Sequence, residues 1–96
     1  MVLQSEFVYI KRYRMGDVKS WVIEWFAKNT GLREEEIEGK AQENYFEKGW
    51  IDSFKFISLV SEIEETFSIS FSNGEFQNTS FATIEGLIST IKDKMD

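Results

Sequence analysis

A periodic apolar pattern between residues 53 and 67 is the feature that most constrains the fold. Its large apolar residues recur at steps of three and four: Phe56, Leu59, Val60, Ile63 and Phe67. This spacing places them on one face of an α-helix, which must pack against other parts of the chain. Asp52-Ser53-Phe54 directly precedes the pattern. Ser53 therefore lies at or beside the helix N-terminus, where its hydroxyl can be exposed and where free backbone N–H groups favour a phosphate.

Two further apolar patterns predict a helix on either side of this one. For the first helix, Asp17 suits the N-cap, and Gly31 suits the left-handed position that commonly follows a helix. Its apolar stripe consists of Val18, Trp21, Val22, Trp25 and Phe26. Thr83 should cap the last helix, and Lys92 and Lys94 lie near its C-terminal end, where cations complement the helix dipole. The core-facing residues of this helix are Ile84, Leu87, Ile88 and Ile91.

We expect a fourth, shorter helix in the segment before the last helix. Ser72-Asn73-Gly74 is a turn signal. A helical turn around Glu75 to Asn78 should follow it and bury Phe76, and Phe81 should also face inward.

A long, polar and acidic segment joins the first two helices. Leu32 and Ile37 should pin this segment to the core, and Tyr45 and Phe46 should be buried anchors. The sequence therefore predicts an all-α fold. We expect a small four-helix bundle of three main helices and one short helix, with a long loop between the first two.

Residues 1–14 do not fit this helical pattern. Phe7, Tyr9 and Tyr13 are spaced as in a short strand, but no other segment predicts a strand to pair with them. We therefore expect a poorly ordered N-terminal arm over residues 1–14, and the folded domain over residues 15–96.

The composition excludes several kinds of function. The chain has no cysteine and no histidine, which excludes disulfides, thiolate sites and the commonest general base, and we expect no metal site. The net charge of −6 argues against binding to nucleic acid or to an anionic membrane. A run of about 18 apolar residues is absent from the sequence, so we expect no membrane insertion. We expect a monomeric, cytoplasmic protein.

Several features together resemble the acyl carrier proteins and the related peptidyl carrier domains, over roughly residues 17–93. They are the triplet Asp52-Ser53-Phe54, the long first connection, the acidic end of the second helix and the Thr83-Ile84 start of the last helix. The triplet alone would be a weak signal, since short motifs recur by chance. Without the wider resemblance, Ser53 would be interpreted as a plain helix cap.

The resemblance implies a carrier and not an enzyme. In the family, a phosphopantetheinyl transferase moves the 4′-phosphopantetheine arm of coenzyme A onto the serine of the triplet, here Ser53. The thiol of that arm then holds acyl or aminoacyl cargo as a thioester. Asp52 would cap the helix and help the transferase to reach the serine. The partners implied are the transferase, an acyl- or aminoacyl-loading enzyme, and a downstream synthase or transferase.

The second helix should be the surface that these partners recognise. Helical spacing places Ser53, Ile57, Ser61 and Glu64 near one line. Phe54 and Ile57 lie outside the core stripe and should form an apolar contact, unless they are partly buried against the loop. Glu64 and Glu65, with Glu62, should meet basic residues of a partner, unless they form only a solvated face.

Two positions depart from the fatty-acid carriers that the chain resembles. Those carriers usually have acids where this chain has Lys55 and Ser58. We therefore expect a free-standing carrier for a specialised pathway, such as polyketide, nonribosomal peptide, modified lipid or surface polysaccharide synthesis. The alternative is a small acidic helical interaction module without a prosthetic group. Trp50 either fills the core or flanks the phosphopantetheine arm.

Overall fold

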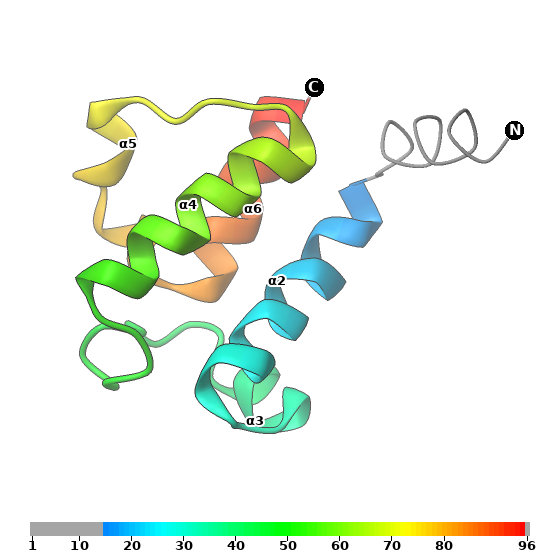
Figure 1. Ribbon diagram of the computed structural model, residues 1–96, viewed down its shortest axis with the longest axis vertical. Helices are drawn as coiled ribbons and strands as arrows, with labels where there is room; N and C mark the ends of the chain where they lie inside the picture. The colour runs from blue at the N-terminus through cyan, green and yellow to red at the C-terminus, as the bar shows by residue number, and fades with distance from the viewer. Residues whose placement is uncertain (1–14, 96) are drawn as a thin grey trace, which may run out of the picture.

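The computed structural model describes residues 15–95, and most of these residues belong to helices (Figure 1). The three main helices are α2 (Met15–Thr30), α4 (Ser53–Phe67) and α6 (Ile84–Met95). The short elements are α3 (Glu34–Gly39), α5 (Asn73–Phe76) and the 3₁₀ helix η1 (Thr79–Ala82). The predicted all-α class with three main helices is confirmed. The N-terminal arm predicted over residues 1–14 lies outside the described residues.

Helices α2 and α4 run antiparallel. The Trp21 ring near the start of α2 meets the Phe67 ring at the end of α4, with the centroids 5.6 Å apart. At the opposite ends, Lys55 Nζ donates to Asn29 Oδ1 over 3.3 Å. Helix α6 lies behind α4 in the view of Figure 1 and packs against α2. Within residues 15–95, none of the helices has the length and apolar character that crossing a membrane requires.

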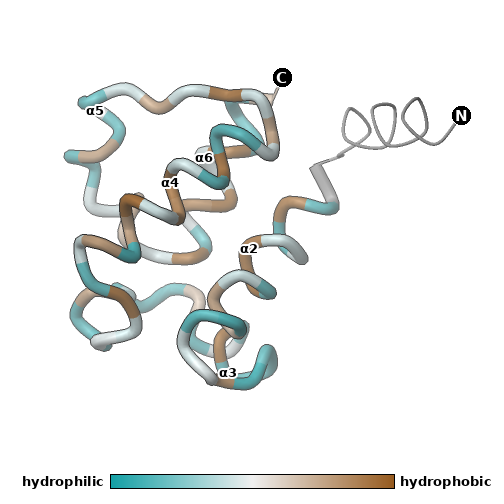
Figure 2. Tube along the Cα trace, viewed as in Figure 1, coloured by the Kyte–Doolittle hydropathy of each residue, from teal (hydrophilic) through white to brown (hydrophobic). Residues whose placement is uncertain are grey.

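Side chains of all three main helices meet in one core. Figure 2 shows hydrophobic and hydrophilic segments alternating along α2 and α4, as expected of amphipathic helices. The fully buried residues on the main helices are Val18, Val22, Phe26, Leu59, Ile63, Ile84, Leu87 and Ile91. The predicted apolar faces of the three helices are therefore confirmed, and Phe81 is buried as predicted.

Ile37 and Tyr45 anchor the connection between α2 and α4, and both are fully buried as predicted. The first part of this connection forms α3, which the sequence pattern does not predict. Three glutamates in the first turn of α3 complement its dipole, and the helix packs against α2. Phe46 is 39% exposed, so its prediction as a buried anchor is wrong. The neighbouring Tyr45 ring occupies the interior position, which leaves Phe46 at the edge of the loop.

Local chemistry explains the helix ends. Gly31 adopts a φ of +79° directly after α2, and Thr83 Oγ1 accepts a hydrogen bond from the Gly86 N–H over 2.9 Å at the start of α6. Both predictions are confirmed. The predicted N-cap at Asp17 is wrong, because α2 already begins at Met15. A carboxylate in the first turn complements the helix dipole as a cap would, so the sequence does not separate the two positions.

Helix α5 begins earlier than the turn predicted from Glu75 to Asn78. Ser72 and Glu75 form a capping box: the Glu75 N–H donates to Ser72 Oγ over 3.4 Å, and the Ser72 N–H donates to Glu75 Oε1 over 2.7 Å. This box starts the helix at Asn73. The predicted burial of Phe76 is wrong, since its side chain is 39% exposed.

Candidate functional site

Asp52 caps the N-terminus of α4 and leaves Ser53 as the first helical residue. Asp52 has an extended backbone (φ −109°, ψ −173°), and its Oδ1 accepts a hydrogen bond from the Lys55 N–H over 2.9 Å. This is the geometry of an N-cap whose side chain satisfies a free backbone donor. The cap function therefore belongs to Asp52, and the helix does not need the Ser53 hydroxyl for it.

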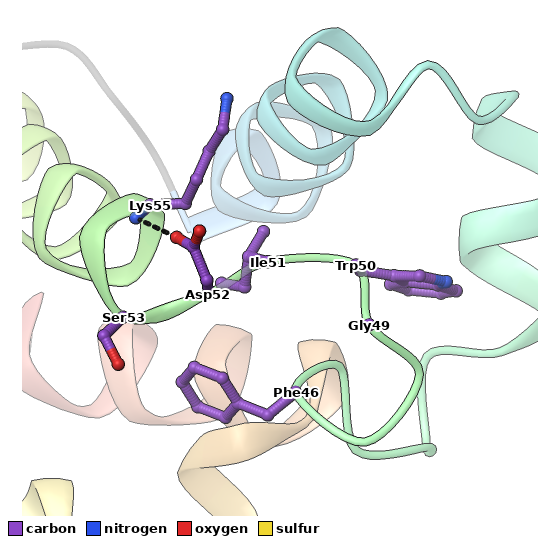
Figure 3. Close-up of a pocket in the computed structure, with 7 residues that line it drawn as sticks. All are labelled: Phe46, Gly49, Trp50, Ile51, Asp52, Ser53 and Lys55. Carbon is purple, nitrogen blue, oxygen red and sulfur yellow. Dashed lines mark hydrogen bonds between the residues drawn. The ribbon is translucent and has the colours of Figure 1, made fainter.

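The Ser53 side chain is exposed and points away from this cap. Figure 3 shows the Ser53 hydroxyl and the Asp52 carboxylate on opposite sides of the chain, with the Phe46 ring on the side of the hydroxyl. Free N–H groups at the start of α4 and the positive end of its dipole lie next to Ser53. An anion attached to Ser53 would be favoured there.

A hollow of about 500 Å³ opens beside Ser53. Residues of the loop before α4 and of its first turn line it: Phe46, Gly49, Trp50, Ile51, Asp52, Ser53 and Lys55 (Figure 3). The hollow is shallow and largely open to solvent. Aromatic, aliphatic and charged side chains all contribute to its wall.

Hydrogen bonds donated by backbone N–H groups hold the loop that carries Phe46. Asn44 Oδ1 accepts from the Phe46 N–H over 2.8 Å and from the Glu47 N–H over 3.0 Å. The backbone N–H of Trp50 donates to the Tyr45 carbonyl over 3.0 Å, which closes the loop. Gly49 adopts a φ of +73°, a conformation that favours glycine. The hollow is therefore bounded by a defined turn.

Tyr45 joins this loop to η1. Its buried hydroxyl donates to the Phe81 carbonyl over 2.6 Å, and its N–H donates to the Ala82 carbonyl over 2.9 Å. Burial raises the pKa of the Tyr45 hydroxyl well above its usual range, so the group stays protonated and keeps donating. These two bonds fix the loop that precedes Ser53 against η1.

Trp50 lines the hollow but turns its indole away from Ser53 (Figure 3). The indole is half-buried, packs against the core and lies 6.3 Å from the Phe26 ring, measured between centroids. Of the two roles that the sequence leaves open, this placement supports packing between the loop and α2.

The exposed side of α4 near Ser53 is apolar. Phe54 is 82% exposed and Ile57 is 62% exposed, so neither is buried against the loop. Ser61 is also exposed, one turn further along the helix. Lys55 is the one charged residue in the segment from Ser53 to Ser61. This part of the surface therefore combines apolar groups with a positive charge.

The acids of α4 lie in its C-terminal half, and two of them have structural partners. Glu62 Oε2 accepts from Trp25 Nε1 over 3.2 Å. Glu64 is half-buried, and its Oε2 accepts from the Phe71 N–H over 2.9 Å, which fastens the chain after α4. Glu65 is exposed. The structural role of Glu64 has no signal in the sequence, because its partner is a backbone group.

Comparison with protein families identifies the family of the chain. A family model described as a phosphopantetheine attachment site matches residues 20–91, which is most of the chain. The chain therefore belongs to this family, and it has the role of a carrier that bears a covalently attached 4′-phosphopantetheine. The resemblance to acyl and peptidyl carrier proteins is confirmed. No curated protein matches the chain.

The residues present fit the prosthetic group. Covalent attachment needs an exposed hydroxyl, and Ser53 provides one that is not required for helix capping. A phosphodiester needs a site that tolerates an anion, and Ser53 lies at the N-terminus of α4. When bound, the group supplies a thiol, which a chain without cysteine lacks.

Proposed function

We propose that Ser53 is the attachment point of the 4′-phosphopantetheine arm. The observation that carries this proposal is the division of roles at the start of α4, where Asp52 caps the helix and Ser53 remains exposed. A transferase has to bring the diphosphate of coenzyme A to the Ser53 hydroxyl, so that hydroxyl must be accessible. The resulting phosphodiester would be stabilised at the helix N-terminus by about 0.3–1 kcal/mol.

On this proposal the protein holds acyl or aminoacyl intermediates as thioesters and catalyses no reaction itself. It passes them, as a monomer, between a loading enzyme and a downstream synthase or transferase. Asp52 has a second task besides capping, since it presents Ser53 to the phosphopantetheinyl transferase.

The partners would dock on α4 around the attachment serine. Phe54 and Ile57 offer exposed apolar area there, and Ser61 continues the same side of the helix. The exposed Glu65 would provide the acidic contact, with a smaller part for Glu64 because its carboxylate already binds the Phe71 N–H. Lys55 would meet an acidic group of the partner.

A specialised biosynthetic pathway is supported by the charge of this surface. Lys55 and Ser58 stand where the fatty-acid carriers that this chain resembles usually have acids. A basic groove that binds such acids would be repelled by Lys55 and would gain nothing from Ser58. Partners adapted to this carrier should instead present apolar and acidic groups.

Intact-mass measurement tests the attachment point. The unaltered protein, incubated with coenzyme A and a broad-range transferase, should gain the mass of one arm, and Ser53→Ala should gain none. Ser58→Ala is the matched control, because Ser58 is also exposed and lies on the same helix. Modification that persists in Ser53→Ala would refute the assignment. An unaltered protein that gains no mass would favour the alternative of an acidic interaction module.

A further inference from the structure

We propose that the hollow beside Ser53 holds the serine-proximal part of the phosphopantetheine arm, with the two methyl groups of its pantoyl unit against the Phe46 ring. This inference rests on the proposed attachment at Ser53. It adds a binding site on this chain for an anionic phosphodiester joined to a branched apolar group.

The first argument for this binding site is the position of the hollow. Ser53 itself lines the hollow, so a group attached to its hydroxyl starts at the wall of the cavity. The hydroxyl points to the side on which the Phe46 ring lies (Figure 3). The first atoms beyond the phosphodiester are therefore the ones that can meet this ring.

Phe46 offers an apolar surface that the fold leaves partly open. Its ring contacts the Tyr45 ring and the Phe56 ring, with centroids 5.1 Å apart in each case, so it is supported by its neighbours. Nevertheless 39% of the residue is exposed to solvent. Covering this area with methyl groups removes apolar surface of both partners from water.

The wall of the hollow is already formed before any group occupies it. The two hydrogen bonds to Asn44 Oδ1 and the one from the Trp50 N–H hold the loop in place. Gly49 lines the hollow with backbone alone, in a left-handed conformation (φ +73°) that favours glycine. A preformed wall lowers the entropy cost of binding a flexible group.

The feature that favours a phosphodiester at the hollow is the positive end of the α4 dipole, and not a side-chain charge. Lys55 lines the hollow, and it is the one charged residue in the segment from Ser53 to Ser61. Its ammonium binds the Asn29 carboxamide and points to the same side of the chain as the Asp52 carboxylate, away from the Ser53 hydroxyl (Figure 3). The Asp52 carboxylate points to the other side of the chain from the Ser53 hydroxyl (Figure 3).

Proton NMR of the loaded protein tests this site without any partner reaction. Protons above an aromatic ring resonate upfield, so the pantoyl methyl signals should lie upfield of those in free coenzyme A. Nuclear Overhauser contacts should join these methyl groups to the Phe46 ring protons. Phe46→Leu keeps apolar bulk and should abolish the upfield shift, whereas Phe46→Tyr keeps a ring and should retain it.

Phe76→Leu is the matched control, since Phe76 has the same exposed fraction as Phe46 but lies on α5. The upfield shift should survive in this variant. Methyl signals at the free coenzyme A position in the unaltered loaded protein would overturn the site, while the added mass would leave the attachment at Ser53 standing. A protein that gains no mass on Ser53 would instead refute the proposed function itself.

Discussion

Gly86 is a residue at which the fold leaves no room for a side chain. A Cβ built there would lie 1.8 Å from the Ser80 carbonyl oxygen and 2.6 Å from the Ser80 carbonyl carbon. These are backbone atoms of η1, so they cannot move aside as a flexible side chain would. The Gly86 N–H also donates to Thr83 Oγ1, which ties the start of α6 to the same region.

Replacing Gly86 by alanine should therefore destabilise the protein by about 1–3 kcal/mol, the usual cost of overpacking. Gly39→Ala is the control, because a Cβ at Gly39 meets nothing within 4 Å. Alanine is the better helix former, so this second change should be neutral or slightly stabilising. Urea denaturation measures both. Equal effects of the two changes would show that the contact between α6 and η1 relaxes freely.

Tyr45 and Phe46 illustrate what a sequence reveals about single residues. The two adjacent aromatic residues look equivalent in the sequence, and the periodic pattern of a helix is absent around them. In the fold, Tyr45 is buried and its hydroxyl donates a hydrogen bond to the Phe81 carbonyl. Phe46 instead lies at the edge of the hollow. That difference depends on a contact 36 residues away in the chain, which local spacing does not encode.

The sequence is more informative about Ser53. The triplet and the apolar pattern that follows it predict a serine at the start of a helix, and α4 begins at Ser53. The assignment of the cap to Asp52 and not to Ser53 needs the structure, because both residue types are good caps.

At the scale of elements, α5 depends on an ionised carboxylate. Glu75 Oε1 accepts from the Ser72 N–H and pairs with Lys94 Nζ of α6 over 3.1 Å. The Ser72 hydrogen bond, with a contribution from Lys94, holds the pKa of Glu75 below its ordinary value of 4.5. Glu75 therefore links the capping box of α5 to the last turn of α6.

Because the pKa of Glu75 is lower in the folded state, its contribution is present above the ordinary value of 4.5 and is lost as the pH falls through the folded-state pKa. Unfolding of Glu75→Gln, measured with urea across this range, should show a deficit near neutral pH that shrinks in acid. Glu65→Gln, a change at an exposed carboxylate of α4, is the control and should change the free energy of unfolding little. A deficit of Glu75→Gln that stays constant with pH would mean that its charge is not the stabilising feature.

Lys55 lies on the part of α4 where we propose that partners dock, so we expect its charge to influence which partners the carrier serves. A cation in the first turn of a helix is disfavoured by about 0.3–1 kcal/mol, so Lys55 does not serve helix stability. We expect the loaded protein to be a poor substrate for fatty-acid-synthase enzymes, whose carrier-binding groove is expected to be basic. Lys55→Asp with Ser58→Glu should raise kcat/KM with such an enzyme by about tenfold at low salt.

The same charge change at a distant place is the control for this prediction. Lys19→Asp with Ser20→Glu alters the start of α2, which lies at the end of α4 far from Ser53, as the contact of Trp21 with Phe67 shows. This variant also removes the ion pair between Lys19 and Glu38 of α3, so its fold is checked by circular dichroism, and its kcat/KM should be nearly unchanged. An unaltered protein that already matches a fatty-acid carrier would remove the main support for a specialised pathway.

Helix prediction succeeds where a long apolar period is present and fails where a short element depends on its surroundings. The bounds of α4 follow from a pattern that spans the whole helix. Helix α3 buries a single apolar residue, Ile37, and six residues do not establish a period. Its stability comes from packing on α2, which the sequence does not display.

At the scale of the whole molecule, the packed core occupies a defined part of the chain. Among the described residues, every buried apolar side chain falls between Val18 and Ile91. The family match covers nearly the same span, residues 20–91. The buried core and the family match therefore cover nearly the same residues, and the elements that position Ser53 lie within them.

Removal of residues 1–14 should therefore leave folding and loading intact. A chain that begins at Met15 keeps all of α2, including the first-turn carboxylate of Asp17, and all the buried residues of the core. Its helical circular dichroism and its rate of mass gain with coenzyme A and a transferase should match those of the full chain. A loss of helical signal on truncation would show instead that aromatic residues such as Phe7 and Tyr13 belong to the core. A normal spectrum with slow loading would assign residues 1–14 to recognition by the transferase.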